Sequence, residues 1–238
     1  MTLLTTELHN HTDPSKAFIV FAADRRISVG SSPADEQEKI FSVPSLNAGI
    51  GYFGLAEIPQ GNGRRPMADW VKEVLAGISG QETLQEFAQN LAASLNGLVP
   101  KLWQSSVVSG FHISGFSKAG SPEFWYVRNV DDDRSTLFGE YRVREDFQNR
   151  DAPKLKPGEH QIYRNGDIRA HVLAWESIDD SFGTLLSAPD FKQFTTPTDY
   201  VEWVKFKIEL IAEFYDRFCR SSIIGKPVDG FLIIPKQS

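Results

Sequence analysis

The stretch Phe18-Ile-Val-Phe-Ala-Ala-Asp-Arg-Arg-Ile-Ser-Val-Gly30 decides the fold of this 238-residue chain. It opens with apolar, β-favouring residues in a run too short for a free helix, which predicts a buried strand over residues 17–23. The charged triplet Asp24-Arg25-Arg26 ends that strand. Two further short strands are expected over 39–43 and 47–54, on either side of Pro44-Ser45.

The rest of the chain alternates helices and strands. Apolar residues spaced three and four apart predict helices over 66–77, 81–98 and 199–218. A hairpin is expected from 111–116 and 124–130, and a last strand over 230–234. Residues 134–198 contain four of the prolines and show no clear element. Because apolar segments are spread along the whole length, we predict one α+β domain over residues 1–238.

Composition excludes several classes of function. The net charge is −6 with no basic stripe, so nucleic-acid binding is not expected. No apolar run reaches about 18 residues, so no membrane span is expected. The only cysteine is Cys219, and the N-terminus lacks the features of a secretory signal. We therefore expect a cytoplasmic protein without an internal disulfide.

Three polar residues near the N-terminus carry a possible chemistry. Thr2 directly follows the initiator methionine, Asp24 ends the first buried strand, and Lys39 begins the next. A threonine hydroxyl is a weak nucleophile until a base removes its proton, and the α-amino group of the same residue can be that base. A free α-amine has a pKa of roughly 7.7–8.0, so it can accept a proton near neutral pH. These residues are the parts of a hydrolase whose N-terminal residue is the nucleophile.

Four segments resemble the proteasome-type β-subunit family of N-terminal-nucleophile hydrolases. They are Ala22-Ala-Asp-Arg-Arg-Ile-Ser-Val-Gly30, Lys39-Ile-Phe-Ser-Val43, Gly51-Tyr-Phe-Gly-Leu-Ala-Glu57 and Arg220-Ser-Ser-Ile-Ile-Gly-Lys-Pro-Val-Asp229. The last is similar to the closing segment of the bacterial ancestral subunits called Anbu. The resemblance covers about residues 2–130 and 199–234. It implies a four-layer αββα sandwich of two antiparallel sheets flanked by helices.

The resemblance also implies a role for each matching residue. Thr2 would be the nucleophile, Lys39 would lower the pKa of its hydroxyl, and Asp24 would hold Lys39 charged and oriented. The backbone N–H of Gly54 would stabilise the oxyanion. Supporting positions would be Arg26, Asp216 and Ser221. The implied substrate is a peptide or protein, no cofactor or metal is needed, and the implied assembly is a homo-oligomeric ring or helical stack.

The chain also departs from the family pattern. The stretch from Thr2 to Asp24 is longer than usual, which fits an enlarged hairpin over residues 9–16. Alternatively Thr5 is the nucleophile after removal of a short propeptide, although we prefer Thr2 because Leu4 rather than glycine precedes Thr5. The family's Gly-Ser-Gly turn is not found in residues 134–160. A catalytically silent assembly subunit is therefore an alternative function.

A second alternative comes from Leu8-His-Asn-His-Thr12, which looks like the opening motif of PHP-type metal-dependent phosphoesterases. On a strand, His9 and His11 would point to the same side and could share a metal ion. Such sites need many histidines, and this chain has five, none of which follows an aspartate. A polar hairpin tip is the simpler interpretation of the motif.

Overall fold

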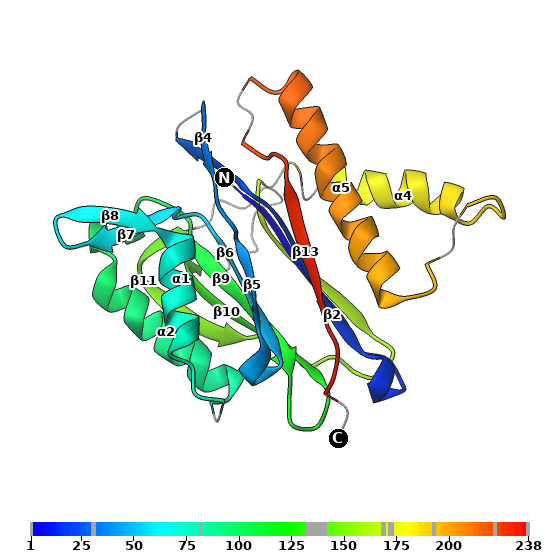
Figure 1. The fold of residues 1–238 in the computed structure, drawn as a ribbon, viewed down its shortest axis with the longest axis horizontal. Helices are drawn as coiled ribbons and strands as arrows, with labels where there is room; N and C mark the ends of the chain where they lie inside the picture. Colours follow the sequence, from blue (N-terminus) through cyan, green and yellow to red (C-terminus); the bar gives the residue numbers. More distant parts are fainter. Residues whose placement is uncertain are drawn as a thin grey trace.

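The computed structural model describes residues 2–29, 32–80, 82–131, 142–167, 170, 174–191, 194–220 and 223–236. Within these ranges the protein is a mixed α+β fold whose strand pairs are all antiparallel (Figure 1). The predicted fold class, α+β with antiparallel sheets, is confirmed at this level.

The first sheet has the strand order β12-β1-β2-β13. Its strands are β1 (Leu3–His9), β2 (Phe18–Asp24), β12 (His160–Gly166) and β13 (Val228–Ile233). The two central strands, β1 and β2, are buried along almost their whole length. A strand covered on both faces needs apolar side chains at successive positions, which explains the unbroken apolar run of β2. The N-terminal and C-terminal parts of the chain thus share one sheet (Figure 1).

The second sheet has the strand order β11-β10-β9-β6-β5. Its strands are β5 (Ile40–Val43), β6 (Ala48–Phe53), β9 (Gly110–Phe116), β10 (Pro122–Asp131) and β11 (Arg142–Asp151). Two small hairpins complete the strands: β3 (Arg26–Val29) with β4 (Ser32–Glu36), and β7 (Glu57–Gln60) with β8 (Gly63–Pro66). The hairpin β3–β4 links the first sheet to the second.

The helices are α1 (Met67–Ala76), α2 (Leu84–Leu98), α3 (Lys101–Gln104), α4 (Trp175–Leu186) and α5 (Pro197–Phe218). Capping boxes start the two longest ones. Thr83 and Glu86 form the box of α2, while Thr196 and Asp199 form that of α5. Among the described residues no helix is both long and apolar enough to cross a membrane.

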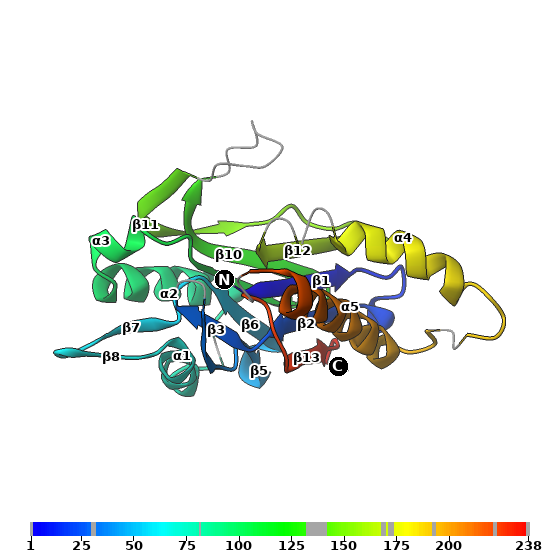
Figure 2. The same cartoon turned by 90° about the horizontal axis from the view of Figure 1, so that it is seen from above.

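Three clusters of buried apolar side chains lie between successive layers of sheets and helices. Figure 2 shows these sheets and helices from above. Side chains of β1 and β2 alternate, so Val20 packs toward α5 and the neighbouring Phe21 packs toward the second sheet. The far face of the second sheet packs against α1 and α2 through a cluster that includes Trp70 and Phe87. Each fully buried side chain of this size contributes roughly 1.5–3 kcal/mol relative to exposure.

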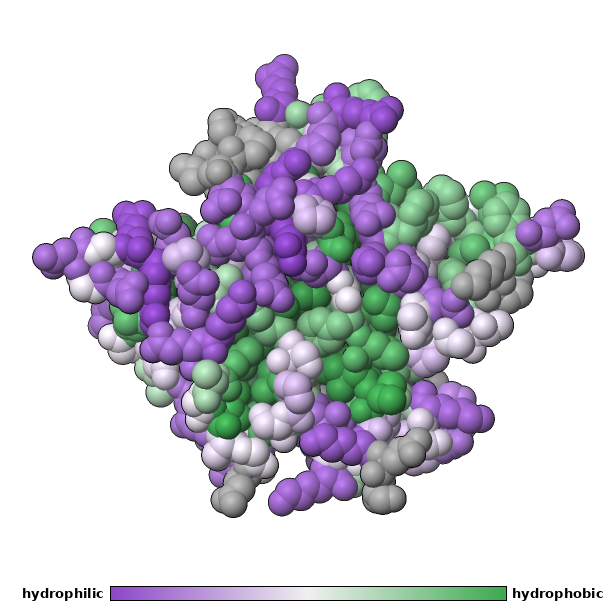
Figure 3. Space-filling view, viewed as in Figure 1, coloured by the Kyte–Doolittle hydropathy of each residue, from purple (hydrophilic) through white to green (hydrophobic). Residues whose placement is uncertain are grey.

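Helices α4 and α5 leave apolar surface on the outside of the molecule. An apolar groove of about 730 Å³ runs between them. Beside it Phe214 is 61% exposed and Phe218 is 72% exposed. Figure 3 shows apolar atoms gathered on the right, where these two helices meet.

Elements with strong periodicity were predicted correctly. The helices expected over 66–77, 81–98 and 199–218 are α1, α2 and α5, and the expected hairpin is β9–β10. The unreadable stretch 134–198 contains β11, β12 and α4, which the sequence did not predict. In α4 only Trp175 and Ile178 are buried, and β12 has no buried residue within its bounds, so neither shows an apolar pattern.

Candidate active site

The N-terminal end of β1 lies against the end of β2. Leu4 pairs with Ala23, which puts Leu3 opposite Asp24, and the backbone N–H of Leu3 donates to Asp24 Oδ1 at 2.7 Å. Thr2 precedes Leu3 directly and is only 5% exposed. The antiparallel register therefore holds Thr2 within one residue of a buried carboxylate.

Asp24 and Lys39 form a buried ion pair between the two sheets. Lys39 Nζ lies 3.2 Å from Asp24 Oδ1 and donates to the carbonyl oxygen of Arg26 at 2.6 Å. The backbone N–H of Gly225 donates to Asp24 Oδ2 at 3.3 Å. Because β2 ends at Asp24 and β5 begins directly after Lys39, the pair joins the sheets at this end of the molecule.

For each residue of this pair, burial and the charge of the partner have opposite effects on the pKa. Burial raises the pKa of Asp24, opposed by the positive charge of Lys39 and by the hydrogen bonds from Leu3 and Gly225. Burial lowers the pKa of Lys39, opposed by the negative charge of Asp24. The carboxyl group of Asp24 accepts from Leu3, Lys39 and Gly225. Because hydrogen bonds to the charged form favour that form, we assign Asp24 and Lys39 as an ionised pair. Removing either partner would leave the other charge buried alone.

Arg26 and Asp216 form a second ion pair close by. Arg26 Nη1 contacts Asp216 Oδ1, and its Nη2 donates to Oδ2 at 3.4 Å. Arg26 Nη1 also donates to the carbonyl oxygen of Ile224 at 3.1 Å. Arg26, two residues after Asp24, thus ties the end of α5 and the segment before β13 to the start of β3. Ser221 lies outside the described residues.

Gly54 follows β6 at the same end of the second sheet. The backbone N–H of Tyr52, two residues earlier, donates to the carbonyl oxygen of Lys39 at 3.0 Å. Gly54 has a φ of +91°, and a Cβ there would lie 2.2 Å from the carbonyl oxygen of Val108. Only glycine fits this backbone and this space. The described contacts bring Asp24, Lys39, Arg26 and Asp216 together, but none joins Gly54 directly to Thr2.

Two other threonines lie deeper in β1. Thr5 is fully buried, and its hydroxyl has no hydrogen-bond partner among the described residues. Thr6 Oγ1 lies 2.9 Å from His112 Nδ1, and His112 Nε2 lies 2.6 Å from Asn165 Oδ1. Asn165 Oδ1 can only accept, so His112 Nε2 donates to it and Nδ1 accepts from Thr6. This hydroxyl–imidazole–amide series was not predicted, and Thr6 and His112 are sealed in the space between the sheets.

The sequence also missed the segment that covers Thr2 from the other side. Leu3 pairs with Gly166 at the end of β12. Gly166 has a φ of +128°, and a Cβ there would lie 1.5 Å from the carbonyl oxygen of Thr2. The next residue, Asp167, is 2% exposed. This glycine lies just beyond residues 134–160, which contain no Gly-Ser-Gly turn.

The two histidines of the phosphoesterase motif have separate surroundings. His9 stacks on Phe18 with ring centroids 4.2 Å apart. His11 lies in an exposed turn, where its Nδ1 accepts from the backbone N–H of Asp13 at 3.0 Å. Among the described residues, no group of three or more His, Cys, Asp or Glu side chains is placed to hold a metal ion. His171 lies outside the described residues.

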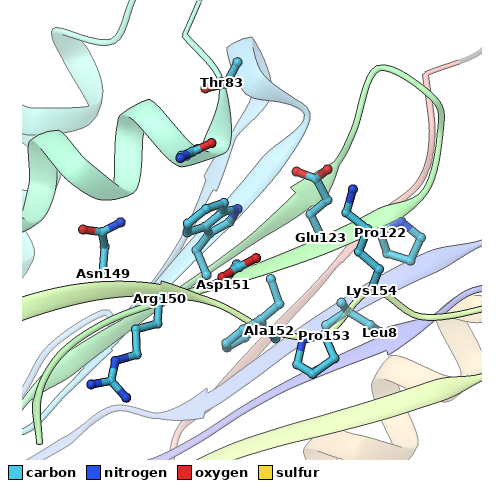
Figure 4. A pocket seen from close by; sticks show the side chains of 13 residues that line it. Leu8, Thr83, Pro122, Glu123, Asn149, Arg150, Asp151, Ala152, Pro153 and Lys154 are labelled. Atoms are coloured by element: carbon cyan, nitrogen blue, oxygen red, sulfur yellow. The ribbon is translucent and has the colours of Figure 1, made fainter. Parts of the chain in front are cut away.

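The opposite end of β1 borders an open cavity of about 570 Å³ (Figure 4). Leu8 lines it, together with the N-terminal turn of α2 and the ends of β10 and β11. Glu123, Asp151 and Lys154 give it a charged rim, as Figure 4 shows. None of the predicted site residues reaches this cavity.

Comparison with known proteins does not assign this chain to a family. A scan against protein-family models finds no match for this chain, and a search of curated proteins finds none either. The function is therefore inferred from the residues and their geometry.

Proposed function

We propose that this protein is a proteasome-like N-terminal threonine hydrolase that cleaves peptide or amide bonds, with Thr2 as the nucleophile. One observation carries the proposal. The backbone next to Thr2 hydrogen-bonds to Asp24, and Asp24 pairs with Lys39 inside the protein. In a chain that begins at Thr2, a hydroxyl and a terminal amine would lie at the same end of the sheets as this buried ammonium.

The proposed cycle moves one proton twice. In the first step Thr2 Oγ forms a bond to the substrate carbonyl carbon while the α-amine takes the hydroxyl proton. The tetrahedral intermediate then expels the amine product, which receives that proton, and leaves an ester on Thr2. Water attacks the ester with the α-amine again as the base, which releases the acid and restores Thr2. The ammonium of Lys39 favours the developing negative charge on Oγ.

The surroundings support these roles. The Arg26–Asp216 pair holds α5 and the segment before β13 around Asp24. The amide of Gly54, at the end of β6, is the proposed oxyanion donor, a contribution typically of about 3–4 kcal/mol. The layered packing of two antiparallel sheets against helices on either side supports the resemblance to the proteasome-type family.

We also propose that the chain works in the cytoplasm as a homo-oligomer. The exposed Phe214 and Phe218 beside the α4–α5 groove support self-association, because monomers rarely expose large apolar patches. The described helices include no membrane-spanning candidate, and no basic surface for nucleic acid is expected from the net charge.

The decisive experiment is covalent labelling of the intact protein. A peptide epoxyketone forms a ring with both the hydroxyl and the α-amine of an N-terminal threonine, so it reports on both groups. We expect intact-mass analysis to show loss of Met1, and tandem mass spectrometry to locate the adduct on Thr2. Thr2→Ala should lower turnover of fluorogenic peptides by about 1,000-fold or more without changing the assembly.

Other outcomes would select the alternatives. An adduct on Thr5, or turnover that survives Thr2→Ala but not Thr5→Ala, would move the nucleophile to Thr5. A folded, assembled protein that begins at Thr2 yet neither reacts nor turns over a broad peptide library would be a silent assembly subunit. Stoichiometric zinc or manganese retained through purification, and lost in His9→Ala, would instead favour the phosphoesterase.

A further inference from the structure

The turn that follows β6 is held by the hydroxyl group of Ser109. The backbone N–H of Leu55 donates to Ser109 Oγ at 3.1 Å, and that hydroxyl donates in turn to the carbonyl oxygen of Val107 at 3.2 Å. The contact is close, because a Cβ built on Gly54 would lie 2.4 Å from the same Oγ. Ser109 is buried, whereas Gly54 is exposed, and no described hydrogen bond uses the N–H of Gly54. Ser109 thus fixes the amide next to the one that we propose as oxyanion donor.

Ser109 is itself held by the side chain of Asn129 in β10. The backbone N–H of Ser109 donates to Asn129 Oδ1 at 2.7 Å. Asn129 Nδ2 donates to the carbonyl oxygen of Gln104 and, at 2.8 Å, to that of Val107. The side chain of Asn129 is fully buried and makes three of the four hydrogen bonds that an amide can make. These bonds close the segment between α3 and β9 onto β10.

Asn129 stands where the pairing of β10 with β11 is irregular. The register shifts between Arg128 and Val130, and Asn129 has no partner in β11. On the β9 side its backbone N–H still donates to the carbonyl oxygen of Ser109 at 3.1 Å. Bulged positions often direct a side chain away from the regular ladder and are common next to active sites. Here the irregularity directs a buried amide to the segment that holds Ser109.

We propose that Ser109 and Asn129 are positioning residues that hold the Gly54–Leu55 turn so that the N–H of Gly54 stays directed to the oxyanion. This inference rests on the proposed function, because Gly54 is its proposed oxyanion donor. Neither side chain has to touch the substrate, since Asn129 fixes Ser109 and Ser109 fixes the turn. A donor stabilises the transition state most when it is already in place before the reaction. A loosened turn should therefore weaken transition-state binding and leave substrate binding almost unchanged.

The test combines hydrogen exchange with kinetics on the full-length protein. Ser109→Ala removes the acceptor of the Leu55 N–H, so mass spectrometry should show that amide exchanging at least about tenfold faster. We expect kcat to fall about 10- to 30-fold with KM within about twofold of wild type, because a displaced donor loses its effect on the transition state. A peptide aldehyde forms a hemiacetal with Thr2 whose oxygen occupies the oxyanion position, so its inhibition constant should rise by the same factor as kcat falls.

A second variant tests the other member of the pair. Asn129→Asp places an acceptor in front of the carbonyl oxygens of Gln104 and Val107, and it should give the same changes in exchange and in kcat. If Ser109→Ala is poorly folded, Ser109→Cys keeps a polar atom of similar position that accepts only weakly, and it should show smaller changes in the same direction.

The control is Ser114→Ala. Ser114 is a fully buried serine of β9 whose Oγ donates to the carbonyl oxygen of Glu123 at 2.7 Å. It lies five residues from Ser109, which is roughly 17 Å along the strand. Its replacement also removes one buried hydrogen bond, but Leu55 exchange, kcat and aldehyde inhibition should stay at wild-type values. Equal losses in Ser109→Ala and Ser114→Ala, or an unchanged Leu55 exchange in Ser109→Ala, would overturn the proposal.

Failure of this inference can be told apart from failure of the proposed function. Faster Leu55 exchange in Ser109→Ala, together with turnover that survives Thr2→Ala, would retain the hold on the turn and reject Thr2 as the nucleophile. Normal kcat in Ser109→Ala and Asn129→Asp, together with turnover lost in Thr2→Ala, would retain the hydrolase and reject the positioning role.

Discussion

The terminal end and the middle of β1 carry the same side chain in contrasting surroundings. Thr2 lies directly before the strand, and the backbone N–H of the next residue, Leu3, donates to Asp24 of the Asp24–Lys39 pair. Thr5 and Thr6 lie within the strand and are fully buried, with Thr6 bonded to His112. By hydrogen-bond pattern alone, Thr6 with its imidazole and amide partners looks more like a catalytic site than Thr2 does.

The difference is position along the strand, because Thr2, although only 5% exposed, lies before the first pair of β1 with its neighbours. A substrate carbonyl must come within bonding distance of the hydroxyl, and Thr6 is enclosed by the two sheets with neighbours paired on both sides of its strand. Thr2 precedes the paired part of β1 and brings its own amine once it is the first residue. Hydrogen-bond partners of a side chain in the core stabilise the fold. The same kinds of partner beside an N-terminal residue can take part in a reaction.

The largest effect is expected from Lys39→Met. The variant leaves Asp24 charged and buried without its ammonium partner, which costs roughly 3–5 kcal/mol of unfolding free energy. It also removes the charge proposed to activate Thr2, so turnover should fall by about 1,000-fold. Urea unfolding and peptide turnover measure the two losses separately.

The double variant Asp24→Asn with Lys39→Met separates the two roles of this pair. It removes both charges, so much of the lost stability should return, while turnover stays at the level of the single variant. A double variant that recovers both stability and turnover would show that the pair is only structural. The Thr2 end of β1 would then resemble the middle of the strand in function.

A smaller effect is expected from Gly54→Ala. The positive φ and the 2.2 Å approach of a new Cβ to the carbonyl oxygen of Val108 both oppose alanine. We expect a loss of about 2–3 kcal/mol in unfolding free energy, with reduced turnover because the backbone at the proposed oxyanion donor must shift. Thermal and urea unfolding, together with kcat, provide the measurement.

Gly61 is the matched control, because it has a φ of +55° and nothing within 4 Å of a new Cβ. Gly61→Ala should show only the cost of the backbone conformation, about 1 kcal/mol, and normal turnover. Equal losses of turnover in the two variants would rule out a specific role for Gly54.

Thr6→Val is expected to affect stability alone. The side chain keeps its size, but His112 Nδ1 loses its hydrogen-bond donor inside the core, which costs roughly 1–3 kcal/mol. Turnover at a temperature where the variant is folded should stay near the wild-type value. A loss of turnover as large as that of Thr2→Ala would indicate that the catalytic residues lie in the middle of β1.

The sequence predicted those parts of the fold whose signal is local. The apolar run of β2 and the periodic faces of α2 and α5 are visible within one segment each. The strand β12 was not predictable in this way, because it is a polar edge strand whose place is set by pairing with β1.

The same contrast applies to the candidate site. Asp24 and Lys39 stand at the ends of recognisable strands, so their meeting could be expected from the family resemblance, and they do meet. Gly166 ends a strand without an apolar pattern, and its position opposite Leu3 depends on a register between residues far apart in the chain. No local feature of the sequence distinguishes it from the chain's other glycines.

The smallest effect concerns Glu7, on the face of β1 toward α5. Burial raises the pKa of Glu7, but His9, whose Nε2 lies 3.8 Å from the carboxylate, the charge of Lys207 and the hydrogen bond from Tyr200 outweigh it, so the pKa is lowered overall. A lowered folded-state pKa means that the unfolded chain binds more protons in acid. This contribution to stability is present above the unfolded pKa and is lost as the pH falls through the folded pKa.

Glu7→Gln should therefore flatten the acid side of the stability profile. Below about pH 4.5, the ordinary pKa of the group, the unfolding free energy of the wild type should fall faster than that of the variant. At pH 7 the variant should be about 1 kcal/mol less stable, because the hydrogen bond from Tyr200 is no longer charge-assisted. Urea unfolding between pH 3 and pH 7 checks both, with Glu202→Gln on the exposed side of α5 as control. Parallel profiles for wild type and Glu7→Gln would mean that Glu7 titrates alike in both states, and this face of β1 would then contribute packing only.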